Sequence, residues 1–237
     1  MRTASIRPRL DQIGELTRGL QLPLPEIEAV HIEILAERLL RAFNDIRAQS
    51  PTTVASGSEA EVTALMEARL NTLIEEDLFW GQLVLCVARG KESLSFDGSH
   101  LEKRPDLSIY LSNRTRVFPL IVEAKIIDSA TARTEILYCD HGLRRFVDGE
   151  YAWGTREAFM IAYVRDGSSI ESRLKPFLVN VMTHVPPGYL MEELPIAADG
   201  SSSDLARSRH GRRFVYSNQS PPANQPGAIA VWHLWLS

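Results

Sequence analysis

Two acidic residues and one lysine near the middle of the chain have the types and spacing that metal-assisted hydrolysis requires. Asp106 opens one alternating segment, and Glu123-Ala124-Lys125 closes the next apolar one. Converging carboxylates repel unless a cation lies between them. Mg²⁺ prefers carboxylate, carbonyl and water oxygens, and it makes a bound water a stronger acid. The Ala124 carbonyl is a further candidate ligand, and Lys125 could hold the attacking water or stabilise charge on a phosphate.

A β-hairpin is expected to bring these residues together. Residues 106–111 and 117–125 have strand patterns, and turn-forming residues separate them. A turn centred on residues 113–116 opposes apolar residues throughout: Leu107 with Val122, Ile109 with Leu120, and Leu111 with Phe118. Opposed residues share a face, so this register sets Asp106 opposite Glu123, with Lys125 on the same face. A slip by one residue would mix core and polar positions.

The flanking segments alternate between helical and strand patterns. Helices are expected at residues 24–49, 58–77, 131–146 and 169–183. Strands are expected at 82–88, 106–111, 117–125 and 158–164, with further candidates at 189–194, 214–216 and 229–236. Residues 199–203 and 217–227 have loop composition. This order predicts the α/β class, a central mixed β-sheet flanked by helices.

The second helix carries two glutamates in its first turn. Ser58 and Glu61 match the capping-box pattern S-x-x-E, in which both side chains bond to backbone N–H groups at the helix start. Glu59 lies between them in the sequence. Either glutamate could point toward the hairpin.

Pro105-Asp106 followed by Glu123-Ala124-Lys125 resembles the signature of the PD-(D/E)xK nucleases, which include many restriction endonucleases and repair nucleases. The resemblance implies a restriction-endonuclease-like core in which Asp106 and Glu123 bind the metal and Lys125 is the catalytic lysine. In that family the first helix often adds a glutamate to the metal site. Glu61 is the first match for it and Glu59 the second. The alternative for Glu61 is a capping role alone.

Three regions are expected along the chain. Residues 1–57 form an N-terminal arm and a helix that packs on the core, residues 58–183 form the nuclease core, and residues 184–237 form an irregular extension that completes the same domain. With 44% hydrophobic and 24% charged residues, the chain can form an ordinary globular core. Two cysteines are too few for a disulfide framework, which indicates a reducing, cytoplasmic setting. Cys86 lies in an apolar run and is expected to be buried.

Basic residues near the motif are candidates for nucleic-acid contact. The net charge of −4 disfavours a non-specific coat protein, but a local basic strip is sufficient for phosphate contact. Arg144 and Arg145 follow the motif on the next helix, and Lys103-Arg104 directly precedes it. The densest basic run, residues 207–213, contributes Arg209, Arg212 and Arg213. The alternative for each is a solvated surface position.

The resemblance implies a Mg²⁺-dependent endonuclease, with Mn²⁺ as a possible substitute, that cuts DNA as the effector of a prokaryotic restriction or anti-phage system. It also implies a homodimer and a sensor or helicase/ATPase partner. No run of about 20 apolar residues is present, so no membrane partner is expected. Two alternatives remain: a catalytically silent nucleic-acid-binding or scaffold module of the same fold, and a partner-activated RNase.

Overall fold

The computed structural model describes residues 10–92, 95–97, 103–198, 204–216, 219 and 224–237. Its strands are β1 (Val84–Arg89), β2 (Leu107–Leu111), β3 (Leu120–Ile127), β4 (Glu157–Val164), β5 (Met191–Ala197), β6 (Asp204–His210) and β7 (Ile229–Leu236). Its α-helices are α1 (Leu10–Leu16), α2 (Ala29–Gln49), α3 (Pro51–Ser56), α4 (Glu59–Glu76), α5 (Leu78–Leu83), α6 (Glu135–Tyr138), α7 (Arg144–Val147) and α8 (Lys175–Met182). Single turns of 3₁₀ helix occur at Ser129–Thr131 and Gly188–Leu190, and π-helical turns at Cys139–Leu143 and Ile170–Leu174.

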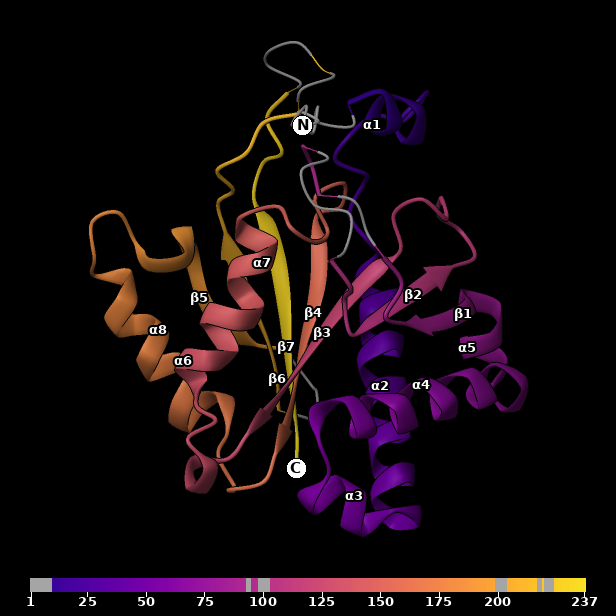
Figure 1. The fold of residues 1–237 in the computed structure, drawn as a ribbon, viewed down its shortest axis with the longest axis vertical. Coiled ribbons are helices and arrows are strands. Elements are labelled where there is room, and N and C mark those ends of the chain that lie inside the picture. The colour runs from indigo at the N-terminus through magenta and orange to yellow at the C-terminus, as the bar shows by residue number, and fades with distance from the viewer. Residues whose placement is uncertain (1–9, 93–94, 98–102, 199–203, 217–218, 220–223) are drawn as a thin grey trace, which may run out of the picture.

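The seven strands form one mixed sheet in the order β1-β2-β3-β4-β7-β6-β5. The three strands in its middle, β3, β4 and β7, run parallel, and the outer pairs are antiparallel. Helices α2 and α4 cover one face, and α6, α7 and α8 cover the other (Figure 1). The expected α/β class and helix-flanked mixed sheet are confirmed. Within the described residues, no helix has the length and apolar character needed to cross a bilayer.

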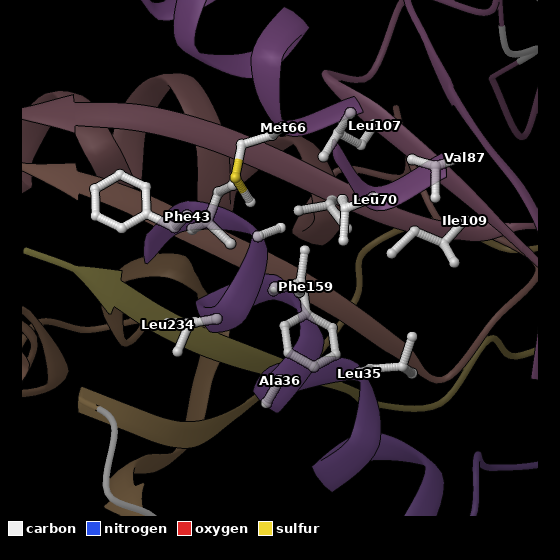
Figure 2. Packing of buried hydrophobic residues seen from close by; sticks show 14 of the residues in the cluster. Leu35, Ala36, Phe43, Met66, Leu70, Val87, Leu107, Ile109, Phe159 and Leu234 are labelled. Carbon is white, nitrogen blue, oxygen red and sulfur yellow. The ribbon is translucent and has the colours of Figure 1, made fainter. Parts of the chain in front are cut away.

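The larger core lies between α2, α4 and the sheet. Apolar residues recur at helical spacing on both helices and meet every second residue of the strands. Figure 2 shows part of this cluster: Leu35, Ala36 and Phe43 of α2, Met66 and Leu70 of α4, and Val87, Leu107, Ile109, Phe159 and Leu234 of the sheet. On the opposite face, α6, α7 and α8 cover a second buried cluster that includes Met160. Because both faces are covered, β4 is buried along its whole length.

The hairpin has the expected register. Leu107 pairs with Val122 and Ile109 with Leu120. The third expected pair is wrong, because β3 begins at Leu120, directly after a proline that has no N–H to donate to the ladder. Phe118 instead packs edge-on against Trp153, with ring centroids 4.7 Å apart.

The helix expected at residues 131–146 is interrupted. A π-helical turn at Cys139–Leu143 separates α6 from α7. Gly142 in this turn faces the sheet, where an added Cβ would lie 2.3 Å from Met160 Cε and 3.6 Å from Glu123 Cγ. The π turn therefore brings backbone close to the acidic residue of the motif, and only glycine fits there without a shift of its neighbours.

The C-terminal region is more regular than expected. It supplies β5, β6 and β7, and β7 lies between β4 and β6 in the sheet. The basic run at residues 207–213 is strand as far as His210, whereas residues 214–216, a candidate strand, are not a strand. The expected loop at 199–203 lies outside the described residues, as does most of the loop at 217–227. Long-range pairing decides these positions, and local composition does not encode it.

Two smaller expectations also differ from the structure. The first long helix begins at Ala29 instead of residue 24, because the N–H of Leu24 is donated to the Gly154 carbonyl. Cys86 is exposed, because β1 is an edge strand. Of the expected irregular arm, residues 1–9 lie outside the described residues and Leu10–Leu16 is helical.

Candidate active site

The site lies where β3 continues beyond the start of β2. The ladder between these strands ends at the Leu107–Val122 pair, so β3 has an open edge beyond that point. Two carboxylates take the place of the missing strand. The Ala124 N–H donates to Asp106 Oδ2 at 2.7 Å, and the Ile126 N–H donates to Glu59 Oε2 at 3.2 Å. Acidic side chains from β2 and α4 are thereby held against the edge of β3 by its own backbone.

The ammonium of Lys125 lies among three carboxylates. Its Nζ is 2.9 Å from Glu123 Oε1, 3.1 Å from Glu59 Oε1 and 3.7 Å from Asp106 Oδ2. It also donates to the Ala124 carbonyl at 2.5 Å. Burial alone would lower the pKa of Lys125, but the neighbouring negative charges outweigh it and raise the pKa. The lysine is therefore a permanent cation at this position.

Glu123 is the most buried acid of the site, with 1% of its surface exposed. Its Oε1 accepts from Lys125 and, at 3.0 Å, from Arg145. Its Oε2 is buried and has no hydrogen-bond partner among the described residues. Burial, with a further contribution from the charge of Asp106, raises the pKa of Glu123 to about 7 despite the two cations.

Arg145 belongs to the site itself. Its guanidinium bonds to Glu123 and, also at 3.0 Å, to the hydroxyl of Tyr151, and it stacks over the Tyr151 ring at 5.4 Å. Arg145 was expected to contact the DNA backbone. The structure instead directs its side chain inward, to the carboxylate of Glu123. Tyr151 was not singled out in the sequence, where nothing local marks it.

Glu59, and not Glu61, is the helix glutamate at the site. The Glu61 carboxylate accepts the Ser58 N–H at 2.7 Å, and Ser58 Oγ accepts the Glu61 N–H at 3.3 Å, which is a complete capping box. This corrects the expectation that Glu61 is the first match for a metal ligand. The reason is geometric: the third residue of a helix folds back onto the cap, whereas Glu59, at the first position, reaches Lys125.

A groove of about 520 Å³ opens at Glu59, Asp106 and Lys125. The N-terminus of α4 forms one wall and α6 with the π turn forms the other, while Asp106 and Lys125 also line it. Arg133 and His141 are exposed and line the same groove. Arg133 carries no sequence signal beyond its charge.

The other expected nucleic-acid contacts are engaged elsewhere or remain on the surface. Their partners are as follows: Lys103 with Glu150 at 2.8 Å, Arg104 with Glu92 at 2.7 Å, Arg144 with Asp140 at 2.8 Å, and Arg209 with Glu192 at 3.1 Å. Arg212 bonds to backbone carbonyls of Thr155 and Gly227, and burial lowers its pKa to about 10. Arg212 is therefore a structural residue, which corrects its assignment to DNA. Arg213 is exposed.

The side chains of the site offer oxygen donors that a metal ion could use. Within the described part of the chain, no three His, Cys, Asp or Glu side chains surround a common point that could hold one. Lys125 is the cation shared by the carboxylates in this arrangement. The chemistry nevertheless fits Mg²⁺, because Glu123 Oε2 is an unpartnered buried oxygen and the Asp106 carboxylate and Ala124 carbonyl are further hard donors.

No family model matches this chain, and the comparisons with curated proteins and with solved structures give no match either.

Proposed function

We propose that this protein is a metal-dependent nuclease of the PD-(D/E)xK type that hydrolyses phosphodiester bonds in DNA. One observation carries the proposal: Asp106, Glu123 and Lys125 meet at the open edge of β3. Ala124, between the two motif positions, bonds to both sides of the constellation through its N–H and its carbonyl. A salt bridge on a solvated sheet face would not need an acid that is 1% exposed.

Each residue has a distinct part in this proposal. Asp106, Glu123 and the Ala124 carbonyl would hold Mg²⁺, or Mn²⁺ in its place. When bound, the ion would acidify a water and neutralise phosphate charge. Lys125 orients that water or stabilises the charge on the phosphate oxygens. Glu59 holds the Lys125 ammonium in position, and Arg145 holds the Glu123 carboxylate in position.

The charge balance of the site supports a cation requirement. Three carboxylates face two cations, Lys125 and Arg145, so the fully ionised site keeps an excess of negative charge. The exposed Arg133 in the groove offsets this excess, and a divalent ion would add the positive charge that attracts a phosphodiester. Binding of nucleic acid in the groove is therefore expected to depend on the metal.

The test is cleavage of supercoiled plasmid in Mg²⁺ and in Mn²⁺, with single-stranded DNA and RNA substrates in parallel. Lys125→Ala is expected to lower the cleavage rate by at least about 100-fold. Lys175→Ala is the matched control, because Lys175 is a surface lysine that pairs with Glu171 on its own helical segment. Equal rates for Lys125→Ala and wild type would refute the assignment of the lysine.

A catalytically silent nucleic-acid-binding or scaffold module is the second candidate. It is favoured by the ion pairs of Glu123, which already holds two cations without a metal. Such a module would show no cleavage with any metal, and Lys125→Ala would change its stability and binding only. RNA cleavage in preference to DNA, seen only with a partner protein, would instead favour the RNase alternative.

The biological setting is part of the same proposal. We infer a cytoplasmic effector of a prokaryotic restriction or anti-phage system, acting as a homodimer or with a sensor or helicase/ATPase partner. Cutting both strands of a duplex requires two sites or two encounters, which favours two copies. Sedimentation with and without a short duplex tests whether two copies of the chain assemble. Double-strand breaks made by a monomer, at a rate proportional to the protein concentration, would contradict a dimer.

A further inference from the structure

A pocket of about 360 Å³ lies near the candidate active site, on the same face of the β2–β3 hairpin. Ser108 and Tyr110 line it from β2, and Ile121 lines it from β3. Alternate residues of a strand share a face, so Tyr110 lies on the Asp106 side of the hairpin and Ile121 on the Glu123 side. The residues between them, such as Ile109, face the opposite core.

The segment that follows α7 joins the two sites a second time. The hydroxyl of Tyr151 bonds to Arg145, which binds Glu123. The next two residues, Ala152 and Trp153, line the pocket. The active site and the pocket are therefore neighbours through the sheet and through this segment.

The walls of the pocket are aromatic, and cationic side chains stand among its exposed residues. Phe118 and Trp153 meet edge-on at 4.7 Å, and Tyr110 adds a third ring. The ammonium of Lys91 lies 4.8 Å from the centroid of the Tyr110 ring. Arg116 lines the pocket and is exposed. Rings with adjacent cations are the combination that binds bases and their phosphates.

Tyr110 also contributes an unsatisfied polar group. The residue is 7% exposed, and its hydroxyl has no hydrogen-bond partner among the described residues. A buried hydroxyl without a partner is unfavourable. A ligand with a polar edge would satisfy it, whereas a purely apolar ligand would not.

We propose that this pocket receives an unstacked nucleobase of the strand that the active site cuts. The inference rests on the proposed nuclease function and gives it a subsite. A base offers a flat face to Trp153 or Phe118 and a polar edge to the Tyr110 hydroxyl, and its phosphate would meet Lys91 or Arg116. The volume falls within the range of about 300–1,000 Å³ that is usual for small-molecule sites.

The spacing of the two sites agrees with this occupant. Tyr110 is four positions after Asp106 in the chain, a span of about 13 Å in extended conformation. That span equals about four stacked steps of one DNA strand, and fewer steps when the strand is unstacked. A base within a few nucleotides of the cut is therefore the one that enters. The energy of unstacking would favour mismatched, frayed or single-stranded positions.

The experiment places a single 2-aminopurine at successive positions of an oligonucleotide. Its fluorescence and the dissociation constant are measured with the full chain in Mg²⁺, in a Lys125→Met background that keeps the strand intact. One position near the cut is expected to respond, because the base leaves its stack and meets Trp153. Tyr110→Phe, which removes only the hydroxyl, and Arg116→Gln are each expected to weaken binding by roughly 3- to 10-fold. Arg47→Gln is the charge-matched control outside the pocket, and no change is expected for it.

The outcomes separate this inference from the nuclease proposal. If wild type cuts plasmid but no 2-aminopurine position responds and both pocket variants bind like wild type, the pocket proposal is overturned and the nuclease stands. If one position responds and Tyr110→Phe abolishes the response, but no metal supports cleavage, the base pocket stands and catalysis is refuted. If no oligonucleotide binds at all, both proposals fail.

Discussion

The backbone N–H of Ala124 donates to the carboxylate of Asp106 at 2.7 Å. The residue before β2 is thereby tied to the middle of β3, at the point where the ladder between the two strands has ended. The acid that we assign to metal binding also completes the hydrogen bonding of the sheet. Its substitutions must therefore be chosen so that structure and catalysis can be told apart.

Asp106→Asn and Asp106→Ala are expected to separate these two roles. The asparagine carbonyl can still accept the Ala124 N–H. The free energy of unfolding of Asp106→Asn should therefore stay within about 0.5 kcal/mol of wild type. Alanine leaves that N–H unpaired and should cost about 1–2 kcal/mol. Both variants should lose cleavage, which plasmid assays and urea unfolding together would check. Full activity in Asp106→Asn would remove Asp106 from the metal site.

Glu59→Gln and Glu61→Gln form a matched pair in the first turn of α4. Glu59 holds the ammonium of Lys125 at 3.1 Å, so its neutralisation should slow cleavage by roughly 10-fold. Glu61 is exposed and bonds to Ser58, so its amide should leave the cleavage rate unchanged and affect only the cap of α4. Rate measurements at saturating metal would decide. The reverse order of effects would restore Glu61 as the site glutamate.

Glu123→Gln is expected to stabilise the fold at alkaline pH. Burial raises the pKa of Glu123 to about 7, whereas an unfolded chain has a value near 4.5. Between these values the folded protein binds the extra proton, so this group makes stability fall as pH rises through the window. The amide imitates the protonated acid, and at pH 8 the variant should gain roughly 1–3 kcal/mol.

Urea unfolding without metal, from pH 5 to pH 8, measures this effect as the difference between the two proteins. Glu157→Gln is a useful comparison, because burial raises the pKa of Glu157 to about 7 as well, and its charged neighbours are Arg114, Glu26 and Arg156 instead of the motif residues. A Glu123→Gln protein that is less stable than wild type at pH 8 would show that the two cations dominate the environment of Glu123.

Two buried histidines are expected to be neutral and to have opposite tautomers. Ser208 Oγ lies 2.7 Å from Nε2 of both His210 and His233. His210 Nδ1 must donate to the Tyr189 carbonyl, so its Nε2 accepts the single proton of Ser208. Ser208 then accepts from Nε2–H of His233. Nδ1 of His233 lies 2.9 Å from the Tyr138 hydroxyl, whose single proton is shared between that nitrogen and the Met160 carbonyl at 3.2 Å.

Nitrogen-15 NMR of the two rings tests this arrangement. Burial lowers the pKa of His210 to about 4 and that of His233 to about 3. Both rings should therefore stay neutral at pH 5, where a free histidine is charged. Since the unfolded chain takes up those protons, these two groups make stability fall as pH drops below about 6.5. A ring that titrates near pH 6.5 would contradict the chain of bonds.

Gly142→Ala is expected to destabilise the protein and to disturb the site. The added Cβ would lie 2.3 Å from Met160 Cε and should cost roughly 1–3 kcal/mol. Met160→Leu shortens the opposing side chain and should recover part of that loss in the double variant, a coupling that chemical denaturation can measure. Additive effects in the two variants would mean that Gly142 is needed for its backbone and not for the space beside Met160.

The part of the site that the sequence predicts correctly is the part with local periodicity. Alternation over residues 106–111 and 117–125 determines which residues of the hairpin oppose each other, and the observed pairs of Leu107 and Ile109 follow it. The proximity of Asp106, Glu123 and Lys125 follows from the same register. Such patterns constrain the strands because a shift by one residue exposes the core.

The remaining features depend on contacts that are distant in the chain. Glu59 and Glu61 are both plausible at a helix start. The capping box accounts for Glu61, whereas the contact of Glu59 with β3 depends on the direction of α4. Arg145 is basic in sequence like its neighbour Arg144, but one turns to Glu123 and the other to Asp140. The π turn at Cys139–Leu143, which precedes Arg144 and Arg145, has no characteristic residue pattern apart from Gly142.

The place of β7 in the sheet also affects how the molecule forms. Residues 229–236 insert between β4 and β6, both of which come earlier in the chain. During synthesis, therefore, β3 with Lys125 leaves the ribosome before β7 does. At that stage the edge of β4 that will pair with β7 still lacks its partner strand. A nascent chain in this condition has Asp106, Glu123 and Lys125 but not its finished sheet, so the candidate site is expected to assemble only after residues 229–236 are available to pair.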